Sequence, residues 1–494
     1  MISLEKYLKT GLIVSIILIN IGCKKIPKNN EVTQIKIENT VSEVIIEKTE
    51  NITTKSDEVV YKELLDDKIS HNKNVLNEID YYNYDENFFI ENIIEPNKII
   101  MNKSEIINFN KKNILDNDFM YNISEFFDFL KGEEINKRIL TVSTPSKYNR
   151  YKKNGLIMSE DDYKILHENL NLKTNINDDY PIKFGICVNR TIMKSYPTDI
   201  QISVLPGDIA YDRFTESAIY PNESMAILNE STDNNWYFVQ VFHSAGWVKK
   251  EDIGLCKKDI IIDSEKNENF AIVTDKMINI VYYDNNLGEI NNISYDMGVK
   301  IKIKDVDNKS DYILGYLPFK DEKNNLIYKK LNLERKSLNI GYLPYTKENL
   351  IKQSFKFLGE YYGWGGLNNS RDCSAFLQDI YRTFGIQIPR NSSQQGKYSI
   401  GKTLNFIEQD DFNSKYTMLK DMEMGAGIYI PGHVMMYLGE YNGKHYVIHT
   451  FTGYYRDNKY VDVMKGAITT LDIKSKDGKT YLEKVYAVKE FIYK

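Results

Sequence analysis

The sequence predicts a multi-domain protein in which a mainly helical segment and two small all-β modules precede an α+β domain. The chain has 494 residues, which exceeds the size at which one hydrophobic core usually stops growing. Residues 181–344 contain short apolar runs separated by Gly, Pro, Asn and Asp, a pattern typical of strands and turns. After residue 345, one strongly helical periodicity is followed by further strand-like runs.

The N-terminus indicates export and a lipid anchor. Lys6 and Lys9 precede an apolar run at 11–19 that is short for a membrane span, and Gly22-Cys23 follows at once. We therefore expect a lipoprotein signal peptide at 1–22 and acylation of Cys23, which would attach an exported protein to the cell membrane in the cell envelope. The polar residues 23–84 have the composition of a disordered tether.

Two alternatives to the lipid anchor remain. Asn20 occupies the position three before Cys23 where such signals usually carry Leu. A simple secretory signal with an incidental cysteine is therefore the main alternative, and a retained membrane span is less favoured.

Residues 85–180 read as mainly helical. The aromatic run 125–130 is part of this interpretation, and Ser159 with Asp162 forms a capping-box pattern at a helix start. No group of residues with catalytic spacing occurs in this segment.

Two strand-rich modules follow, at 181–256 (module 1) and 257–344 (module 2). Module 1 has strand-like runs at 225–228, 236–241 and 246–248. Module 2 has runs of similar length at 270–273 and 301–304, without a strict repeat. Aromatic side chains in both are expected to fill the interior of a small barrel and not to form a ligand platform.

Cys373 occupies the predicted start of a helix in the C-terminal domain, residues 345–494. Apolar residues recur with helical spacing from Phe376 to Phe384, and Gly385 follows as a stop signal. Asp372 would cap this helix, so Cys373 would lie at the positive end of the helix dipole, where a thiol pKa is lowered. A small buried cysteine is the simpler reading of the same residue.

His433 and His449 fall on two strand-like runs, 433–438 and 444–449, which would form a hairpin. A two-residue turn at Asn442-Gly443 is the strongest local signal, but by simple alternation it places the histidines on opposite faces. A five-residue loop centred on Tyr441 instead pairs the two histidines about 5 Å apart. We expect the longer loop, because a thiolate nucleophile needs a base and an orienting group.

These residues belong to a longer pattern that resembles the NlpC/P60 family of papain-like cysteine peptidases over residues 345–494. The matching motifs are Tyr362 before Trp364-Gly365-Gly366, then Asp372-Cys373-Ser374, Ile388-Pro389-Arg390 with Ser392, and Gly432-His433. The resemblance implies that Cys373 is the nucleophile, His433 the general base and His449 the third polar member. It also implies that the Tyr362 hydroxyl helps to stabilise the oxyanion.

The upstream modules are similar to bacterial SH3-type barrels. The whole order resembles the subgroup that cuts peptidoglycan stem peptides between γ-D-glutamate and a diamino acid, with module 1 walling the site. In that subgroup Asp372, Ser374 and Ser392 match substrate-facing positions. Asn391 replaces an Asp that often binds the substrate amine, so preference for a free amine is open.

We therefore expect a cell-wall hydrolase with a papain-like NlpC/P60 domain, two SH3-type barrels and a helical N-terminal segment. An amidase or acyltransferase of the same fold and a catalytically idle wall-binding lipoprotein are the alternatives. The expected partners are peptidoglycan stem peptides and, through the lipid, the membrane. A net charge of -5 argues against nucleic acid.

The remaining cysteines and histidines have no predicted chemistry. Cys187 and Cys256 are interpreted as small core residues, although they could pair. His445 is expected to be solvated beside the turn. No metal or cofactor is assigned, because no histidine has Cys or paired carboxylates at ligand spacing.

Overall fold

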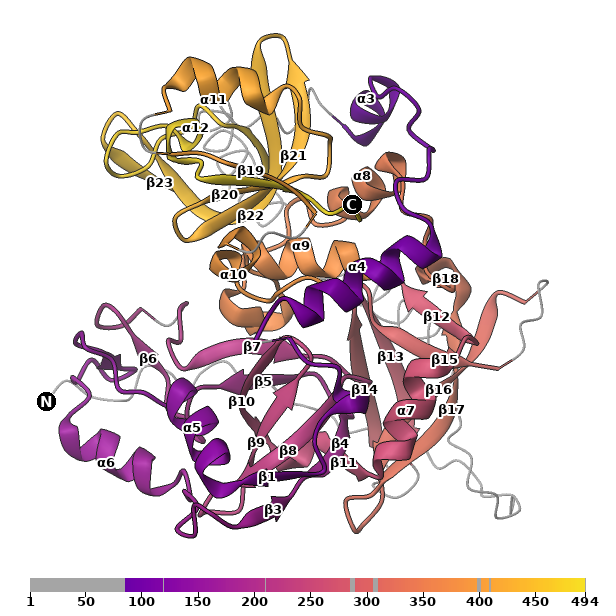
Figure 1. Ribbon diagram of the computed structural model, residues 1–494, viewed down its shortest axis with the longest axis vertical. Coiled ribbons are helices and arrows are strands. Elements are labelled where there is room, and N and C mark those ends of the chain that lie inside the picture. The colour runs from indigo at the N-terminus through magenta and orange to yellow at the C-terminus, as the bar shows by residue number, and fades with distance from the viewer. Residues whose placement is uncertain are drawn as a thin grey trace, which may run out of the picture. The chain divides into compact units, whose positions relative to one another are not determined.

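The computed structural model describes residues 85–493, except for 119, 209, 285–288, 305–309, 398–400 and 408–409 (Figure 1). The expected signal peptide, Cys23 and the tether lie outside the described residues. Within those ranges, no helix has the length and apolar character needed to cross a bilayer.

The segment before module 1 is mainly helical, as predicted. Its helices and short strands are α3 (Glu86–Glu91), α4 (Lys103–Leu115), η1 (Ile123–Glu125), β1 (Phe129–Lys131), α5 (Gly132–Val142), β2 (Tyr151–Lys152) and α6 (Glu160–Glu168). The predicted capping box is present at α6, where the Ser159 hydroxyl accepts from the Asp162 N–H and the Asp162 carboxylate accepts from the Ser159 N–H. A second capping box, from Asn102 and Glu105, starts α4.

The helical interpretation of the aromatic run 125–130 is wrong. Asn122 caps only the single turn of η1, and its side chain accepts from the Ser124 N–H. The chain then extends into β1, which pairs antiparallel with β3 (Asp179–Pro181). Pairing with a strand distant in sequence has overridden the local pattern.

Module 1 is built from antiparallel strands, and the three predicted runs lie in β8, β9 and β10. The strands are β4 (Lys183–Cys187), β5 (Thr191–Lys194), β6 (Ile202–Ser203), β7 (Thr215–Ile219), β8 (Ser224–Glu230), β9 (Trp236–Val241), β10 (Ser244–Lys249) and β11 (Ile253–Cys256), with η2 (Lys250–Asp252). All except β6 join one sheet in the order β11-β4-β8-β9-β10-β5-β7, while β6 pairs with β2. Trp247 and Phe238 lie in its core, as the barrel interpretation expects.

Module 2 is also strand-rich and begins with a helix. Its elements are α7 (Lys258–Lys266), β12 (Phe270–Val273), β13 (Met277–Asp284), β14 (Glu289–Asp296), β15 (Lys300–Ile303), β16 (Tyr312–Lys320), β17 (Leu326–Glu334), η3 (Arg335–Ser337) and β18 (Leu338–Ile340). One sheet runs in the order β17-β16-β15-β12-β18, and β13 with β14 forms a separate hairpin. The two predicted runs correspond to β12 and β15.

The C-terminal domain places helices against an antiparallel sheet. Its helices are α8 (Lys347–Phe355), η4 (Trp364–Asn369), α9 (Cys373–Arg382), α10 (Ser392–Lys397), α11 (Phe412–Leu419) and α12 (Tyr481–Lys484). Its strands are β19 (Lys402–Asn405), β20 (Gly427–Ile430), β21 (His433–Tyr441), β22 (Lys444–Arg456), β23 (Lys459–Thr470) and β24 (Ala487–Glu490). The sheet order is β19-β24-β20-β21-β22-β23.

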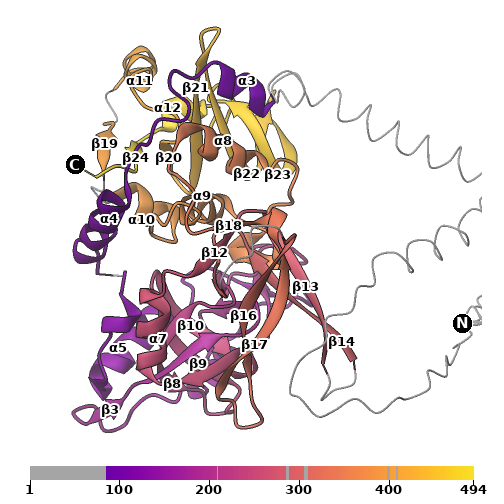
Figure 2. The ribbon, with the colours of Figure 1, turned by 90° about the vertical axis from the view of Figure 1, so that its right-hand side faces the viewer.

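Helix α9 is the buried helix of this domain and starts where the sequence predicts. The Asp372 carboxylate accepts from the Ala375 N–H, and Gly385, with φ +78°, follows the last turn. Phe376 and Ile380 join one hydrophobic core with strand residues of β21 and β22. Helix α4 lies alongside the segment that follows α9 (Figure 2), where Asn110 donates to the Gly385 carbonyl.

Arg371, the residue before the cap, is fully buried and holds α9 against both modules. Its Nη2 lies 2.7 Å from Asp296 of module 2, Nε lies 2.9 Å from Asp379 of α9, and Nη1 lies 2.9 Å from Glu360. Arg190 of module 1 contacts the second oxygen of Asp296 at 3.0 Å. We call these five residues the junction cluster.

The junction cluster is buried and makes a further hydrogen bond to module 1. The Tyr220 hydroxyl of module 1 donates to Asp379 at 3.0 Å, so this carboxylate joins module 1 as well. Burial raises the pKa of Asp296, although Arg371 and Arg190 oppose that rise. Such carboxylates remain charged in the interior only while their arginines are present.

We predict that Arg371→Gln lowers the free energy of unfolding by about 3 to 5 kcal/mol, because three buried carboxylates would lose their shared cation. Chemical denaturation of the full-length chain, followed at the first unfolding transition, measures the change. Arg335→Gln, which removes a charge in module 2 outside the junction cluster, should change stability by less than about 0.5 kcal/mol. Superimposable curves for wild type and Arg371→Gln would contradict the prediction.

Candidate active site

The hairpin of β21 and β22 has the two-residue turn, so the prediction of a five-residue loop is wrong. Tyr441 pairs with Lys444, and Asn442 and Gly443 both have positive φ, at 51° and 74°. A β-bulge at Leu438 then adds one residue to β21, and beyond it Met436 pairs with Ile448. The extra residue reverses the alternation, so both histidines reach the same face.

His433 and His449 are in direct contact. His433 Nε2 lies 2.7 Å from His449 Nδ1, and His449 Nε2 lies 3.0 Å from the Thr469 hydroxyl oxygen. If His433 Nδ1 is to take a proton, Nε2 must carry the hydrogen and donate it to His449. His449 must then donate to Thr469. One tautomer of each ring satisfies the whole chain of hydrogen bonds.

Thr469 is a site residue that sequence reasoning missed. It lies on β23 opposite Val447 and is almost completely buried. No motif marks it, because its position behind His449 depends on the register between β22 and β23. Phe451 adds a second restraint by stacking on the His449 ring, with centroids 4.1 Å apart.

Cys373 is the first residue of α9, as predicted, but its thiol is not acidic. Burial, with the nearby Asp372 carboxylate, raises the pKa of Cys373 to about 12, although the N–H groups of Val434 and Ser374 and the Arg390 charge act in the opposite direction. The expected lowering by the helix dipole is therefore outweighed by desolvation. Val434 directly follows His433, so this contact brings the thiol to the end of β21 that carries the histidine.

His433 is neutral in this site. Burial lowers the pKa of His433 to about 4, with Asp372 acting weakly in the opposite direction. Over the neutral pH range the thiol is therefore protonated and the imidazole is uncharged. Attack by this thiol would require its proton to move to a base such as His433, because these protonation states exclude a preformed thiolate–imidazolium pair.

Tyr362 lies beside the thiol with its hydroxyl protonated. Burial raises the pKa of Tyr362 well above its usual value, and the charge of Cys373 acts in the same direction. The N–H of Tyr362 donates to the Met464 carbonyl at 2.9 Å, which fixes its backbone beside β23. A neutral phenol in this position can donate a hydrogen bond to an oxyanion.

Asp372 and Ser374, predicted to face the substrate, are engaged by Arg390. The guanidinium forms two parallel bonds to the Asp372 carboxylate, at 3.0 and 2.7 Å, and a third to the Ser374 hydroxyl at 2.9 Å. Arg390 Nε also donates to the Ser217 hydroxyl of module 1 at 2.8 Å. The helix cap is thereby connected to β7.

The glycine turn before Cys373 lets β7 approach closely. Gly365 and Gly366 both have positive φ, at 58° and 92°. A Cβ atom on Gly365 would lie 2.4 Å from the Thr215 side chain, and one on Gly366 would lie 2.4 Å from the Ala218 Cβ. Only glycine fits at either position, and β7 consequently forms one wall beside the cysteine.

Glu216 of β7 is the second residue that the sequence did not reveal. A β-bulge lies between the pairs Met193–Ser217 and Lys194–Thr215, so Glu216 is the unpaired residue of the bulge. Its side chain is exposed, yet desolvation by the surrounding protein raises the pKa of Glu216 to about 7, with Arg390 acting in the opposite direction. The bulge turns a carboxyl group into the space near Arg390, and no sequence pattern predicts a bulge there.

Asn391 and Ser392 lie at the start of α10. Asn391 is exposed and its carbonyl accepts from the Gln395 N–H at 2.9 Å, while Ser392 is half-buried as the first helical residue. Both follow Arg390 directly, and neither side chain has a contact with the histidine pair.

His445 is buried, so the expectation of a solvated residue is wrong. Its Nδ1 lies 2.8 Å from the Tyr437 hydroxyl and its Nε2 lies 3.0 Å from the Tyr416 carbonyl. Helix α11 is the reason, because its Tyr416 packs against the His445 ring, with centroids 4.4 Å apart, and covers a residue that lies close to the turn. The unpaired cysteines Cys187 and Cys256 lie in module 1, the first buried and the second partly so. The described residues contain no cluster of three metal-ligating side chains.

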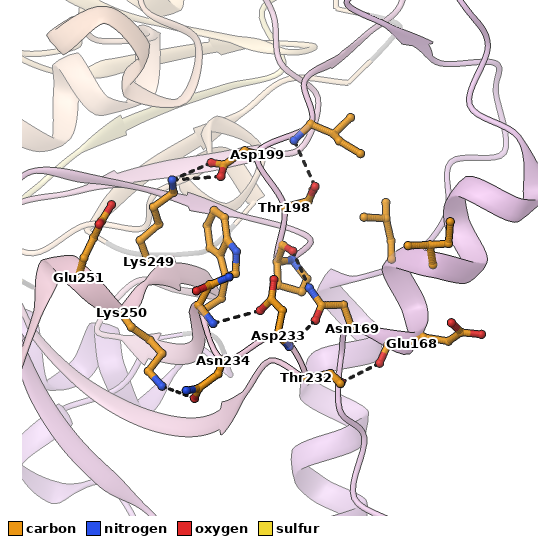
Figure 3. A pocket seen from close by; sticks show the side chains of 16 residues that line it. Glu168, Asn169, Thr198, Asp199, Thr232, Asp233, Asn234, Lys249, Lys250 and Glu251 are labelled. Atoms are coloured by element: carbon orange, nitrogen blue, oxygen red, sulfur yellow. Dashed lines mark hydrogen bonds and ion pairs between the residues drawn. The ribbon is translucent and has the colours of Figure 1, made fainter.

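A separate cavity of about 690 Å3 lies between α6 and module 1 (Figure 3). Several of the polar groups that line it are bonded to one another. Lys249 forms an ion pair with Asp199, and the backbone N–H of Asp233 donates to the Asn169 side chain. It contains none of the predicted site residues. This cavity is therefore separate from the candidate site at Cys373.

We predict that Thr469→Val slows alkylation of Cys373 by iodoacetamide at pH 8 by roughly 10- to 100-fold, the range seen for partners behind a ligating histidine. Without the hydroxyl acceptor, His449 can adopt the other tautomer, and His433 would then hold its proton on the nitrogen needed as base. Thr469→Ser keeps the hydroxyl and should react at close to the wild-type rate. Equal alkylation rates for Thr469→Val and Thr469→Ser would exclude a role for the hydroxyl.

Comparisons with known proteins agree with this geometry. Residues 359–472 match the NlpC/P60 family model, and residues 206–249 match an SH3 domain model of the SH3b1 type. A γ-D-glutamyl-L-lysine dipeptidyl-peptidase of Bacillus subtilis (strain 168) is 32% identical over 109 residues, or 22% of this chain and 36% of that protein. The protein of the same name from Bacillus cereus (strain ATCC 10987) is 31% identical over 99 residues, or 20% and 28%.

The chain thus spans about a third of the length of these curated relatives. The solved structure of an NlpC/P60 endopeptidase from Photobacterium damselae subsp. piscicida covers 82% of this chain and 97% of its own, with a TM-score of 0.66 and 19% identity. That likeness shows the fold. Residues 359–472 therefore form an NlpC/P60 domain by their match to the family model, preceded by an SH3-type match at 206–249, and Cys373 and the contacting pair His433 and His449 all lie within the NlpC/P60 match.

Proposed function

We propose that the chain is a cell-wall hydrolase that cleaves peptidoglycan stem peptides at the bond between γ-D-glutamate and the diamino acid. The observation that carries the proposal is the 2.7 Å contact of His433 with His449 on the strand whose Val434 N–H reaches Cys373. The names of the two Bacillus relatives support the choice of bond. The signal sequence and Cys23 support a lipid-anchored enzyme at the cell envelope.

The reaction is acyl transfer in two steps. Cys373 Sγ attacks the γ-glutamyl carbonyl carbon while its proton passes to His433 Nδ1. The Cys373 N–H and the Tyr362 hydroxyl donate to the oxyanion. As the C–N bond breaks, His433 returns the proton to the departing amine. Water then attacks the thioester, giving a proton to His433, and the thiol leaves with that proton.

The resting protonation states favour a reaction that starts only with bound substrate. With the pKa of Cys373 at about 12 and that of His433 at about 4, few sites hold a thiolate at neutral pH. A bound carbonyl supplies the developing negative charge that the oxyanion donors stabilise, so proton transfer accompanies attack. His449, held by Thr469, stabilises the imidazolium that forms.

Recognition of the substrate's free amine is assigned to Glu216. Asn391 can offer only a neutral acceptor, whereas Glu216 offers a carboxyl group from module 1 within electrostatic reach of Arg390, the residue before Asn391. A pocket for a peptide terminus needs groups on both sides, and β7 supplies the side opposite α9. Module 1 would thus take part in specificity.

The first test uses the full-length chain with L-Ala-γ-D-Glu-L-Lys and with the corresponding diaminopimelate peptide, followed by mass analysis of the products. We expect cleavage after γ-D-glutamate, and no cleavage by Cys373→Ala. Cys256→Ala removes a thiol from β11 and should retain activity. A parallel incubation uses the same peptide carried on N-acetylmuramic acid. Cleavage of its sugar–peptide amide, with the free peptide left intact, would support an amidase, and an active Cys373→Ala would exclude the mechanism.

The second prediction concerns pH and the amine. We compare kcat/KM for a peptide with a free amine with kcat/KM for the same peptide after N-acetylation. The ratio of the first value to the second should rise about tenfold as pH increases from 5.5 to 7.5. The pKa of Glu216 is raised to about 7, so its carboxylate is nearly absent at the lower pH and largely present at the higher, while most of the substrate amine is still charged at both. Glu216→Gln should give a low ratio with no such rise. Glu251→Gln, an exposed residue elsewhere in module 1, should keep the wild-type profile, and a flat wild-type profile would exclude Glu216.

A further inference from the structure

A second charged group of module 1, Arg213, lies against the glycine turn that precedes Cys373. Its guanidinium carbon lies 4.3 Å from the centroid of the Trp364 ring, in the turn before Cys373. The Tyr211 ring bridges Trp364 and Tyr362, with centroid distances of 5.9 and 6.3 Å. Arg213 is therefore one aromatic ring away from the phenol assigned to the oxyanion.

Arg213 lacks an anionic partner among the described residues. Its side chain has no ion pair or hydrogen bond within them, and its buried Nε is unsatisfied. The other arginines near the site contrast with it, since Arg190, Arg371 and Arg390 each contact a carboxylate at 3.0 Å or less. Asp208 acts on Arg213 electrostatically but is not within ion-pair distance.

A second cation lies close to Arg213. Arg150, from the segment before module 1, is near enough that the two charges repel, and its own side-chain bond is to the Asn149 carbonyl at 3.1 Å. Two guanidinium groups held near one another without a shared anion raise the free energy of the empty site. An anion that binds both would remove that repulsion.

Among anions, a carboxylate fits Arg213 best. A planar guanidinium offers parallel N–H donors that match the two oxygens of a carboxylate, and stacking on Trp364 fixes the plane of the group. The substrate of the proposed function carries such groups on both sides of the cut bond. D-Glutamate linked through its γ-carboxyl keeps a free α-carboxylate, and the residue after it has a carboxylate when it ends the peptide.

We propose that Arg213 and Arg150 form a subsite that binds a carboxylate of the peptide substrate. This subsite rests on the proposed function, because the carboxylate belongs to the peptide cut at Cys373. Arg213 would then determine specificity for acidic over amidated peptides. The subsite also involves the segment before module 1 in substrate binding, because Arg150 belongs to that segment.

Matched peptides separate the two sources of the carboxylate. One pair is L-Ala-γ-D-Glu-L-Lys with the α-carboxylate of D-glutamate either free or amidated, and the other pair has the C-terminal carboxylate of lysine either free or amidated. For one pair, wild type should show a kcat/KM about tenfold higher for the acid than for the amide, the scale of one charged hydrogen-bonded contact. The responding pair identifies the group that is bound.

The variants show whether Arg213 is responsible. In Arg213→Gln the acid-to-amide ratio should fall to about one, and in Arg150→Gln it should fall roughly threefold. Arg213→Lys keeps a point charge and should retain part of the ratio. Arg335→Gln, in module 2, should keep the full wild-type ratio, and thermal unfolding establishes that each variant is folded.

Two results would overturn the subsite, and they are distinguishable. In the first, wild type cuts the peptides while Arg213→Gln keeps the same acid-to-amide ratio, because its kcat/KM is unchanged or falls equally for acid and amide. In that case the subsite is wrong and the proposed function stands. If wild type cuts none of the peptides, the proposed function fails, and the subsite fails with it.

Discussion

The position of Cys373 depends on one buried cation, Arg371. Its guanidinium is satisfied by carboxylates from module 2, from α9 and from the strand-like approach to the glycine turn. The partners of such a buried charge must stay in place, because each buried charge left unpaired costs several kcal/mol of folding free energy. Asp372 and Cys373 directly follow Arg371 in the chain. The contacts that hold Arg371 therefore also fix the start of α9 relative to both modules.

Arg390 performs a related task on the other side of the helix start. It binds the capping carboxylate of Asp372 on one side and the Ser217 hydroxyl of module 1 on the other. The close contact of β7 with Gly365 and Gly366 completes the connection. The surroundings of Cys373 are consequently shared between module 1 and the C-terminal domain, and module 1 contributes two charged groups near them, Glu216 on β7 and Arg213 just before it.

The features predicted correctly are those that depend on local chemistry. Helix α9, its Asp372 cap and the strands of both modules follow from periodicity and capping, and these need no knowledge of distant residues. The two histidines were selected for their chemistry, and they do meet. The five-residue loop is wrong because the bulge at Leu438 has no signal in the sequence, and without a bulge the Asn442-Gly443 turn would place the two histidines on opposite faces.

The features that were missed depend on tertiary contacts. The acidity of Cys373 was predicted from the helix dipole alone, whereas burial next to the Asp372 carboxylate acts in the opposite direction and prevails. Thr469 and Glu216 matter because of strand register and a bulge, and neither has a sequence signal. The run 125–130 became a turn and a strand because a distant partner, β3, was available.

The fit of β7 into the glycine turn also bears on when the enzyme becomes competent during synthesis. An exported chain emerges with its N-terminus first, so module 1 can fold before the residues of α9 have emerged. The glycine turn then has β7 to pack against as soon as it forms. Chain order thus favours assembly of the surroundings of Cys373 on a module that is already folded.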